Sequence, residues 1–298
     1  MATFLQLLLS GLALGSVYAL VALGFVVIYR ASQVFNFAQG ELLTFGAFAM
    51  ISLSDAGLPW PLALIGALIG TGLVAAAVER IALRPLVGRP VFVTIMVTIF
   101  VGVILRTLML LIWGTDSRGM PTPWAPNAAV EIAGASVLWN ALASVAFGGV
   151  ALAAFFVAIR KTRLGVAMRA AASDQETAMA LGIPVGRIFS VTWVIAGVFA
   201  ALGGIFLGMF PRSVDIHLGY VALRAFPAVI VGGLESPGGA VLAGMLLGVM
   251  EVLAQGYVNP YLGAFGHNFH AVFPYLVMIA FLVVRPYGLF GVRTVRRI

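Results

Sequence analysis

Long apolar segments alternate with short polar stretches along the whole chain. The apolar segments fall at about 4–29, 37–53, 61–82, 91–113, 137–159, 188–210, 219–234, 239–257 and 271–289. Most of them approach the roughly 20 residues that a helix needs to cross the hydrocarbon core of a bilayer, whereas the strands of a barrel would be short and alternating. The pattern predicts an all-α polytopic membrane protein with a single transmembrane domain over residues 1–298.

The second and seventh segments are short for a span, and we expect them to be broken or re-entrant. The chain then has nine spans, or eight spans and a re-entrant hairpin. Asn36–Ala47 (NFAQGELLTFGA) and Val231–Gly244 (VGGLESPGGAVLAG) each place a polar turn with a glutamate before a helix of small residues. Interrupted segments at corresponding positions of two halves indicate a substrate site near the bilayer midplane. The residues expected to line a translocation path are Asn36, Gln39, Gly40, Glu41, Gly233 and Gly238.

Composition supports the membrane class. Hydrophobic residues make up 62% of the 298 residues and charged residues only 9%, with a mean hydropathy of +1.11; a soluble domain carries about a quarter charged residues. The chain has no cysteine, which excludes disulfide and thiol chemistry. Its net charge of +7 comes from basic residues at the ends of the apolar segments, so no nucleic-acid partner is expected.

The basic residues also predict the orientation. With the N-terminus outside, 13 of the 17 Lys and Arg residues fall on one side of the membrane: Arg30, Arg80, Arg84, Arg89, Arg160, Lys161, Arg163, Arg169, Arg187, Arg285, Arg293, Arg296 and Arg297. Cytoplasmic loops carry an excess of Lys and Arg, so the C-terminus is expected in the cytoplasm. The outer loop Gly114–Ser136 is polar and rich in proline. It either faces a docking protein or caps the helices.

One long charged loop, about residues 160–187, interrupts the apolar sequence. Leu164–Leu181 is rich in Ala, Met and Leu, which favour helix, and Arg169, Ser173, Glu176 and Thr177 would share one face of it. Gly182 and then Pro184 are a stop signal for that helix. A short helix across the cytoplasmic mouth is predicted. It either docks a separate soluble subunit that supplies energy or lies on anionic lipid.

Charged residues also fall near or within apolar segments, among them Glu41, Arg106, Arg224 and Glu251. Such groups are unfavourable in lipid unless they are paired or face a cavity. Arg106, Arg224 and Glu251 are expected in the outer halves of their segments, where one of the arginines can pair with Glu251. A structural pair and a direct role in a path both remain open for these residues.

Catalysis by this chain is not expected. The only lysine, Lys161, has no glycine-rich cradle before it, so there is no phosphate-binding loop. No group of His and acidic residues has metal-ligand spacing, and no nucleophile is accompanied by a base and an orienting group. The chain is therefore predicted to be a non-enzymatic transport subunit that binds no cofactor or metal.

Several stretches resemble a known family. The opening Gly11–Phe48 is similar to that of the integral permease subunits of high-affinity branched-chain amino acid (leucine, isoleucine, valine) ABC importers. So are RPLVGRP (Arg84–Pro90), DQETAMALGI (Asp174–Ile183), GGLESPGGAVLAG (Gly232–Gly244) and RPYGLFG (Arg285–Gly291). They span nearly the whole chain in the family's order.

This resemblance implies a type II-like importer permease in the bacterial inner membrane, surrounded by membrane lipid. It implies a second, homologous permease subunit, two ABC ATPase subunits that carry ATP and Mg, and a periplasmic binding protein that delivers the amino acid. The family's EAA-type coupling motif maps onto Asp174–Ile183. The residues implied to contact the ATPase are Leu164, Gly165, Arg169, Asp174, Glu176, Ala178, Gly182 and Ile183.

Other functions remain open from the sequence. A permease of the same superfamily for urea, short amides or aromatic acids is one alternative. An ion-coupled secondary transporter is another, and Glu41 and Glu251 would then be ion sites. Neither the solute nor the choice between a homodimer and a heterodimer of permeases follows from the residues.

Overall fold

The computed structural model describes residues 2–86, 88–209 and 211–291, with the side chains of 264–267 left aside. Within that part of the chain, six helices are long and apolar enough to cross a membrane. They are α1 (Ala2–Ser32), α3 (Trp60–Val78), α4 (Val91–Trp113), α5 (Trp139–Lys161), α8 (Val185–Leu207) and α11 (Pro237–Leu253). A π turn and a 3-10 turn extend α3 (η1, Glu79–Leu83; η2, Arg84–Leu86), and another such pair follows α11 (η3, Ala254–Val258; η4, Asn259–Asn268).

Shorter helices complete the bundle. They are α2 (Gln39–Asp55), α6 (Arg163–Ser173), α7 (Gln175–Ala180), α9 (Tyr220–Arg224), α10 (Phe226–Gly232) and α12 (Phe269–Val284). The predicted polytopic helical architecture is confirmed. One small sheet is added to it, the antiparallel hairpin of β1 (Ala129–Ile132) and β2 (Ala135–Leu138). The turn between these strands has positive φ at both Ala133 and Gly134, as two-residue hairpins require.

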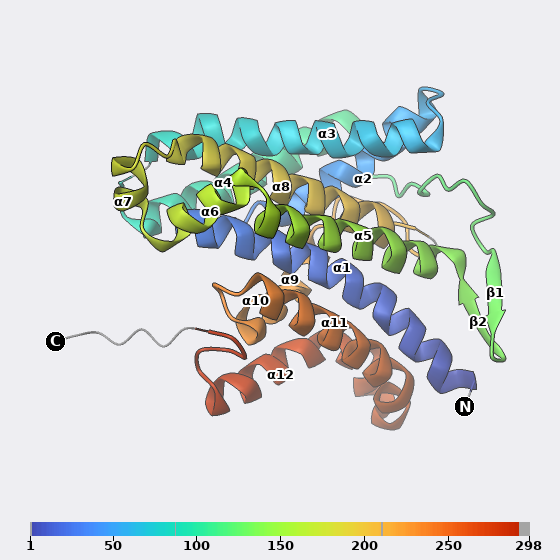
Figure 1. Cartoon of the computed structure of the whole chain (residues 1–298). Helices are drawn as coiled ribbons and strands as arrows, with labels where there is room; N and C mark the ends of the chain where they lie inside the picture. The colour runs from blue at the N-terminus through green and yellow to red at the C-terminus, as the bar shows by residue number, and fades with distance from the viewer. Residues whose placement is uncertain (1, 87, 210, 292–298) are drawn as a thin grey trace.

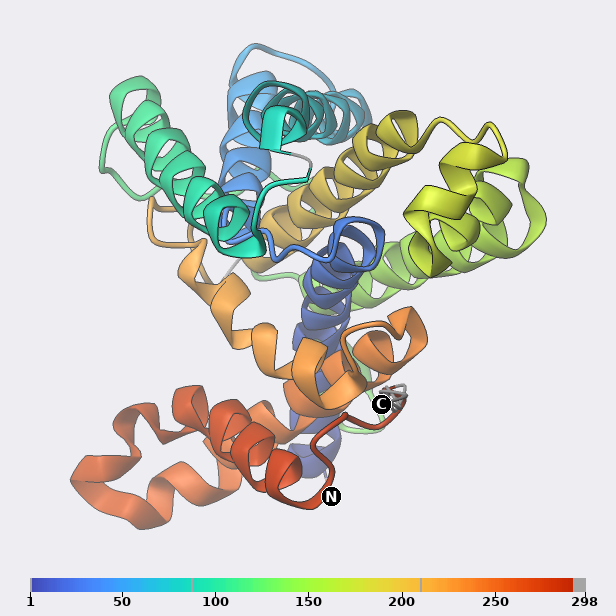
Figure 2. The same cartoon turned by 90° about the vertical axis from the view of Figure 1, so that its left-hand side faces the viewer.

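Helix α1 is the core of the molecule. It lies in the middle of the bundle (Figure 2, dark blue) and packs on α8, α11 and α5. Small residues permit the closest of these contacts, because side chains larger than hydrogen would separate the backbones. A Cβ added at Gly15 would lie 2.7 Å from the carbonyl oxygen of Met245, and one at Gly244 would lie 2.7 Å from the amide nitrogen of Ala19.

The two short segments meet. Residues 33–38 lie between α1 and the start of α2, and residues 208–219 lie between α8 and the start of α9. The two helix starts touch through glycine: a Cβ on Gly40 would lie 2.5 Å from the carbonyl oxygen of Gly219. Of the two segments expected to be broken, 219–234 is divided into α9 and α10, whereas 37–53 lies in the continuous helix α2 and the irregular backbone precedes it. The irregular backbone before α2 and that before α9 share one contact.

The order of the elements repeats around this contact. A long helix, a shorter helical segment and two further helices follow one another as α1–α2–α3–α4 and again as α8–α9/α10–α11–α12. Helix α1 packs on α11, and its counterpart α8 packs on α3. The predicted match of Asn36–Ala47 with Val231–Gly244 is wrong. The second stretch covers the turn from α10 to α11, whereas Gly219 is the residue that contacts the start of α2.

The bundle has two distinct ends (Figure 1). Helices α6 and α7 lie at one end, called here the α7 end, and the β1–β2 hairpin and the N-terminus lie at the other, the hairpin end. Backbone pairing of Arg118 with Val214 joins two loops at the hairpin end. The basic residues Arg293, Arg296 and Arg297 used for the orientation lie outside the described residues.

Candidate functional site

The charged loop forms two helices, and the predicted single helix over Leu164–Leu181 is wrong. Asp174 has an extended backbone (φ −158, ψ 111) between α6 and α7. Its Oδ1 accepts a hydrogen bond from the Thr177 amide at 3.0 Å, and its Oδ2 accepts one from the Thr177 hydroxyl at 2.8 Å. An aspartate that bonds to the backbone two or three residues on favours a helix start over a helix interior. Arg169 and Glu176 therefore do not share a helix face.

The predicted helix stop is in place. Gly182 has φ +81, and the Ile183 amide donates to the carbonyl oxygen of Ala178 at 3.0 Å, the bonding of a glycine-terminated helix. Ala178 is buried and fixes α7 against the bundle. Met179 and Leu181 instead keep 55% and 76% of their surface exposed. The loop thus presents apolar side chains to the outside of the α7 end.

Some of the other predicted coupling residues stabilise the start and the position of α6, and others are exposed on the surface of the loop. Gly165 is buried, and its amide donates to the Thr162 hydroxyl that caps α6, at 3.1 Å. The Arg169 guanidinium donates to the carbonyl oxygen of Ile159 at the end of α5. Leu164 and Glu176 are exposed. Together with Met179 and Leu181 they form the surface of α6 and α7 that is open to a partner.

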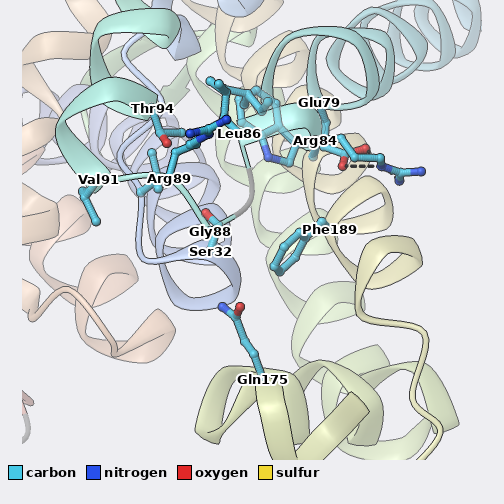
Figure 3. Close-up of a pocket in the computed structure, with 13 residues that line it drawn as sticks. Ser32, Glu79, Arg84, Leu86, Gly88, Arg89, Val91, Thr94, Gln175 and Phe189 are labelled. Carbon is cyan, nitrogen blue, oxygen red and sulfur yellow. Dashed lines mark hydrogen bonds and ion pairs between the residues drawn. The ribbon is translucent and has the colours of Figure 1, made fainter. Parts of the chain in front are cut away.

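A cavity of about 120 Å³ lies beside α7 (Figure 3). Gln175 enters it from α7 and donates to the carbonyl oxygen of Ala31 at 2.9 Å, which ties α7 to the end of α1. On the opposite wall, the buried carboxylate of Glu79 accepts hydrogen bonds from Arg84 at 3.2 Å and from the Ser190 hydroxyl at 2.6 Å. Sequence reasoning missed these residues; the Glu-x₄-Arg spacing before RPLVGRP was the available signal.

A second cavity lies at the contact between the two helix breaks. It has a volume of about 370 Å³ and is called here the central cavity. Its wall on α4 is formed by Ile99, Val103 and Arg106, which lie in the middle turns of that helix. Gly40 and Gly219 line it at the breaks. The cavity is therefore at mid-depth in the bundle.

The predicted path residues do not all reach this cavity. Gly40 and Glu41 line it. Asn36 is fully buried and stabilises the break, because its Nδ2 donates to Gln39 Oε1 at 3.1 Å and its Oδ1 accepts from the Ala38 amide at 3.0 Å. Gln39 in turn donates to the carbonyl oxygen of Ala196 at 3.1 Å.

Gly233 and Gly238 lie elsewhere, at the α7 end: Gly233 directly follows α10, and Gly238 is in the first turn of α11. Gly233 has φ +101 and packs on the backbone of Gly291. Gly238 lines a different cavity, beside Arg160 and Arg169. The structure thus does not bring these two glycines together with Gly40 and Glu41.

Two ion pairs are formed by the charged residues Glu41, Arg106, Arg224 and Glu251. Arg106 Nη2 lies 2.5 Å from Glu41 Oε1 in the central cavity. Arg224 Nη1 lies 3.5 Å from Glu251 Oε1, and the Tyr18 hydroxyl donates to the other oxygen of Glu251 at 2.7 Å. Arg224, and not Arg106, is therefore the arginine beside Glu251. Within the described residues, no group of three or more His, Asp or Glu residues is able to hold a metal ion.

A helical bundle with two helical segments that start at irregular backbone inside the bundle, paired charges and an exposed pair of helices at one end is the architecture of a multi-spanning transport protein. Family comparison is specific within that class. The chain belongs to the family described as the permease component of branched-chain amino acid transport systems, which matches residues 7–282.

Two relatives match almost the whole chain. The high-affinity branched-chain amino acid transport system permease protein LivH of Escherichia coli is 28% identical, over 97% of this chain and 96% of its own length. The corresponding protein BraD of Pseudomonas aeruginosa is 30% identical over the same shares. Among solved structures, PsaBC from Streptococcus pneumoniae in complex with Fab has a TM-score of 0.50 at 12% identity, covering 95% of this chain and 92% of that one. That likeness shows a shared fold.

Proposed function

We propose that this chain is the permease subunit of an ATP-driven importer that carries branched-chain amino acids across the bacterial inner membrane. The carrying observation is the family match over residues 7–282, together with relatives whose names specify that cargo. Those names favour branched-chain amino acids over urea, amides or aromatic acids. ATP hydrolysis, with Mg, resides on separate ATPase subunits.

The N-terminus lies outside and the α7 end faces the cytoplasm. The chain crosses the membrane nine times, if the segments that contain α2 and α9–α10 each count as one crossing. Both of these crossings begin as irregular backbone and continue as helix. Irregular backbone is tolerated at such depth where it is buried in protein or lines a cavity. The hairpin end then faces the periplasm and the binding protein. A second, homologous permease subunit completes a type II-like translocation unit.

Helices α6 and α7 form the surface that contacts an ATPase subunit. Apolar side chains at Leu164, Met179 and Leu181 project from it, and exposed apolar groups clustered among polar residues are typical of a protein contact. Gln175 and Ala178 hold this surface against α1 and the rest of the bundle. A movement of the ATPase subunit against α7 is therefore transmitted to the core helices.

The first prediction tests this contact. The substitution Leu181→Asp puts a charge at an apolar position of the proposed surface, and Glu176→Lys reverses a charge there. We expect both to lower leucine uptake at least about ten-fold and to remove the ATPase subunits from the purified complex. The matched control is Ile132→Asp on the β1 strand, which is also exposed and apolar but lies at the hairpin end.

The control variant is expected to retain the ATPase subunits in the purified complex. Full uptake and normal recovery of the ATPase subunits in the α7 variants would refute the assignment of this surface.

A further inference from the structure

The ion pair of the central cavity contains a carboxylate oxygen and a guanidinium nitrogen that have no hydrogen-bond partner within the described residues. Glu41 Oε1 binds Arg106 Nη2, but Glu41 Oε2 and Arg106 Nε have no hydrogen-bond partner within the described residues. The side chain of Glu41 is only 9% exposed. Buried polar atoms are nearly always hydrogen-bonded in folded proteins, and a pair left partly unsatisfied at a cavity points to a ligand that supplies the missing groups.

Tyr220 positions the guanidinium. Arg106 Nη1 donates to the Tyr220 hydroxyl at 2.5 Å, and the guanidinium carbon lies 4.4 Å from the centre of the same ring. The arginine is thereby fixed on one side by a carboxylate and on another by an aromatic ring. Of its five N–H donors, two are used in these bonds, and the one on Nε has no partner within the described residues.

Most of the remaining side chains of the cavity are apolar. Phe37, Val103 and Leu223 line it, and each is partly exposed because the cavity is open on one side. Its volume of about 370 Å³ lies near the lower end of the about 300–1,000 Å³ usual for small-molecule sites. A small ligand with one positive group, one negative group and an aliphatic part matches both the size and the lining.

We propose that the central cavity is a substrate site within the permease that binds the transported amino acid as a zwitterion. Glu41 binds its ammonium group, Arg106 binds its carboxylate, and its aliphatic side chain contacts Phe37, Val103 and Leu223. This inference deepens the proposed function and rests on it.

The pair selects for zwitterions by charge balance. Without ligand, Glu41 and Arg106 neutralise each other. A ligand with a single charge would satisfy one of them and leave the other buried without a partner, which is strongly unfavourable. A zwitterion supplies both counter-charges at once, so the two residues can separate around it.

The test uses the permease complex with its ATPase subunits in lipid nanodiscs, without the binding protein. Binding is measured by titration with L-leucine, leucinamide, which lacks the carboxylate, and 4-methylpentanoate, which lacks the ammonium group. The wild-type complex is expected to bind leucine at least about ten-fold more tightly than either analogue. Each analogue lacks one charged group, and hydrogen bonds to charged groups contribute more free energy than hydrogen bonds between neutral groups. The Glu41→Gln/Arg106→Gln double variant is expected to bind all three alike.

The other ion pair provides the matched control. The Arg224→Gln/Glu251→Gln double variant removes a similar pair outside the central cavity and is expected to keep the preference for leucine. Leu223→Trp narrows the cavity without touching a charge and is expected to abolish leucine binding, which keeps the test decisive even where the charge variant fails to assemble.

A wild-type complex without preference, or a Glu41→Gln/Arg106→Gln variant that retains it, would overturn the proposed site. Leucine uptake by the complete wild-type system is measured in parallel, so that a failure of the proposed site can be distinguished from a failure of the proposed function. Uptake that persists while the preference is absent refutes only the site, and absence of uptake refutes the proposed function itself.

Discussion

At the scale of single residues, Asp174 decides the form of the charged loop. Its carboxylate accepts from both the amide and the hydroxyl of Thr177, and these bonds hold the pKa of Asp174 below its usual value. A carboxyl group whose pKa is lower in the folded state stabilises that state above the unfolded pKa and loses the contribution as the pH falls through the folded value. At neutral pH the cap of α7 is therefore fully formed.

The second prediction concerns this cap. Asp174→Ala should raise hydrogen exchange at the Thr177 amide severalfold at neutral pH, because that amide loses its partner. Asp174→Asn is the control: an asparagine also caps helices, and it does not titrate, so its protection should persist into acid where that of the aspartate is lost. Equal exchange in the alanine variant and the wild-type protein would contradict the role of the cap.

At the scale of elements, the glycine contacts between α1 and α11 determine how closely the core helices approach. The third prediction is that Gly244→Ala destabilises the protein by about 1–3 kcal/mol, as overpacking of a tight contact usually does. The reason is that the new methyl group would lie 2.7 Å from the Ala19 amide nitrogen. Thermal unfolding in detergent measures the change.

Gly149 is the control for this substitution. It also lies inside a helix, α5, but a Cβ added there meets nothing within 4 Å. Gly149→Ala should therefore be neutral or stabilising by up to about 1 kcal/mol, the difference in helix propensity. If the two variants unfold alike, the close contact between α1 and α11 does not limit stability.

The elements also show what the sequence predicts and what it leaves open. Apolar length predicted the spanning helices, because it is a local property. The expected interruption is present in 219–234 but not in 37–53, which forms the continuous helix α2. The contact of Gly40 with Gly219 was not predicted, since it depends on packing between distant segments. For the same reason, two pairings were open before the structure: Arg106 with Glu41, and Arg224 with Glu251.

At the scale of the whole molecule, the two ends differ in a way that can be tested from outside the cell. The fourth prediction uses the natural absence of cysteine. In the single variant Ser136→Cys, on the hairpin, a membrane-impermeant thiol reagent should label intact spheroplasts. In Ser173→Cys, at the end of α6, labelling should require permeabilised membranes. The reverse pattern would refute the proposed orientation.

The burial of α1 has a consequence for how the protein is made. This helix is synthesised before two of the helices that cover it, α8 and α11, which begin only at Val185 and Pro237. Because α1 is apolar along its length, it can reside in lipid before α8 and α11 are synthesised. Biogenesis must therefore proceed through an inserted but unassembled intermediate, and the core closes only after residue 253 has left the ribosome. A chain interrupted before α11 would reach the membrane without ever acquiring its fold.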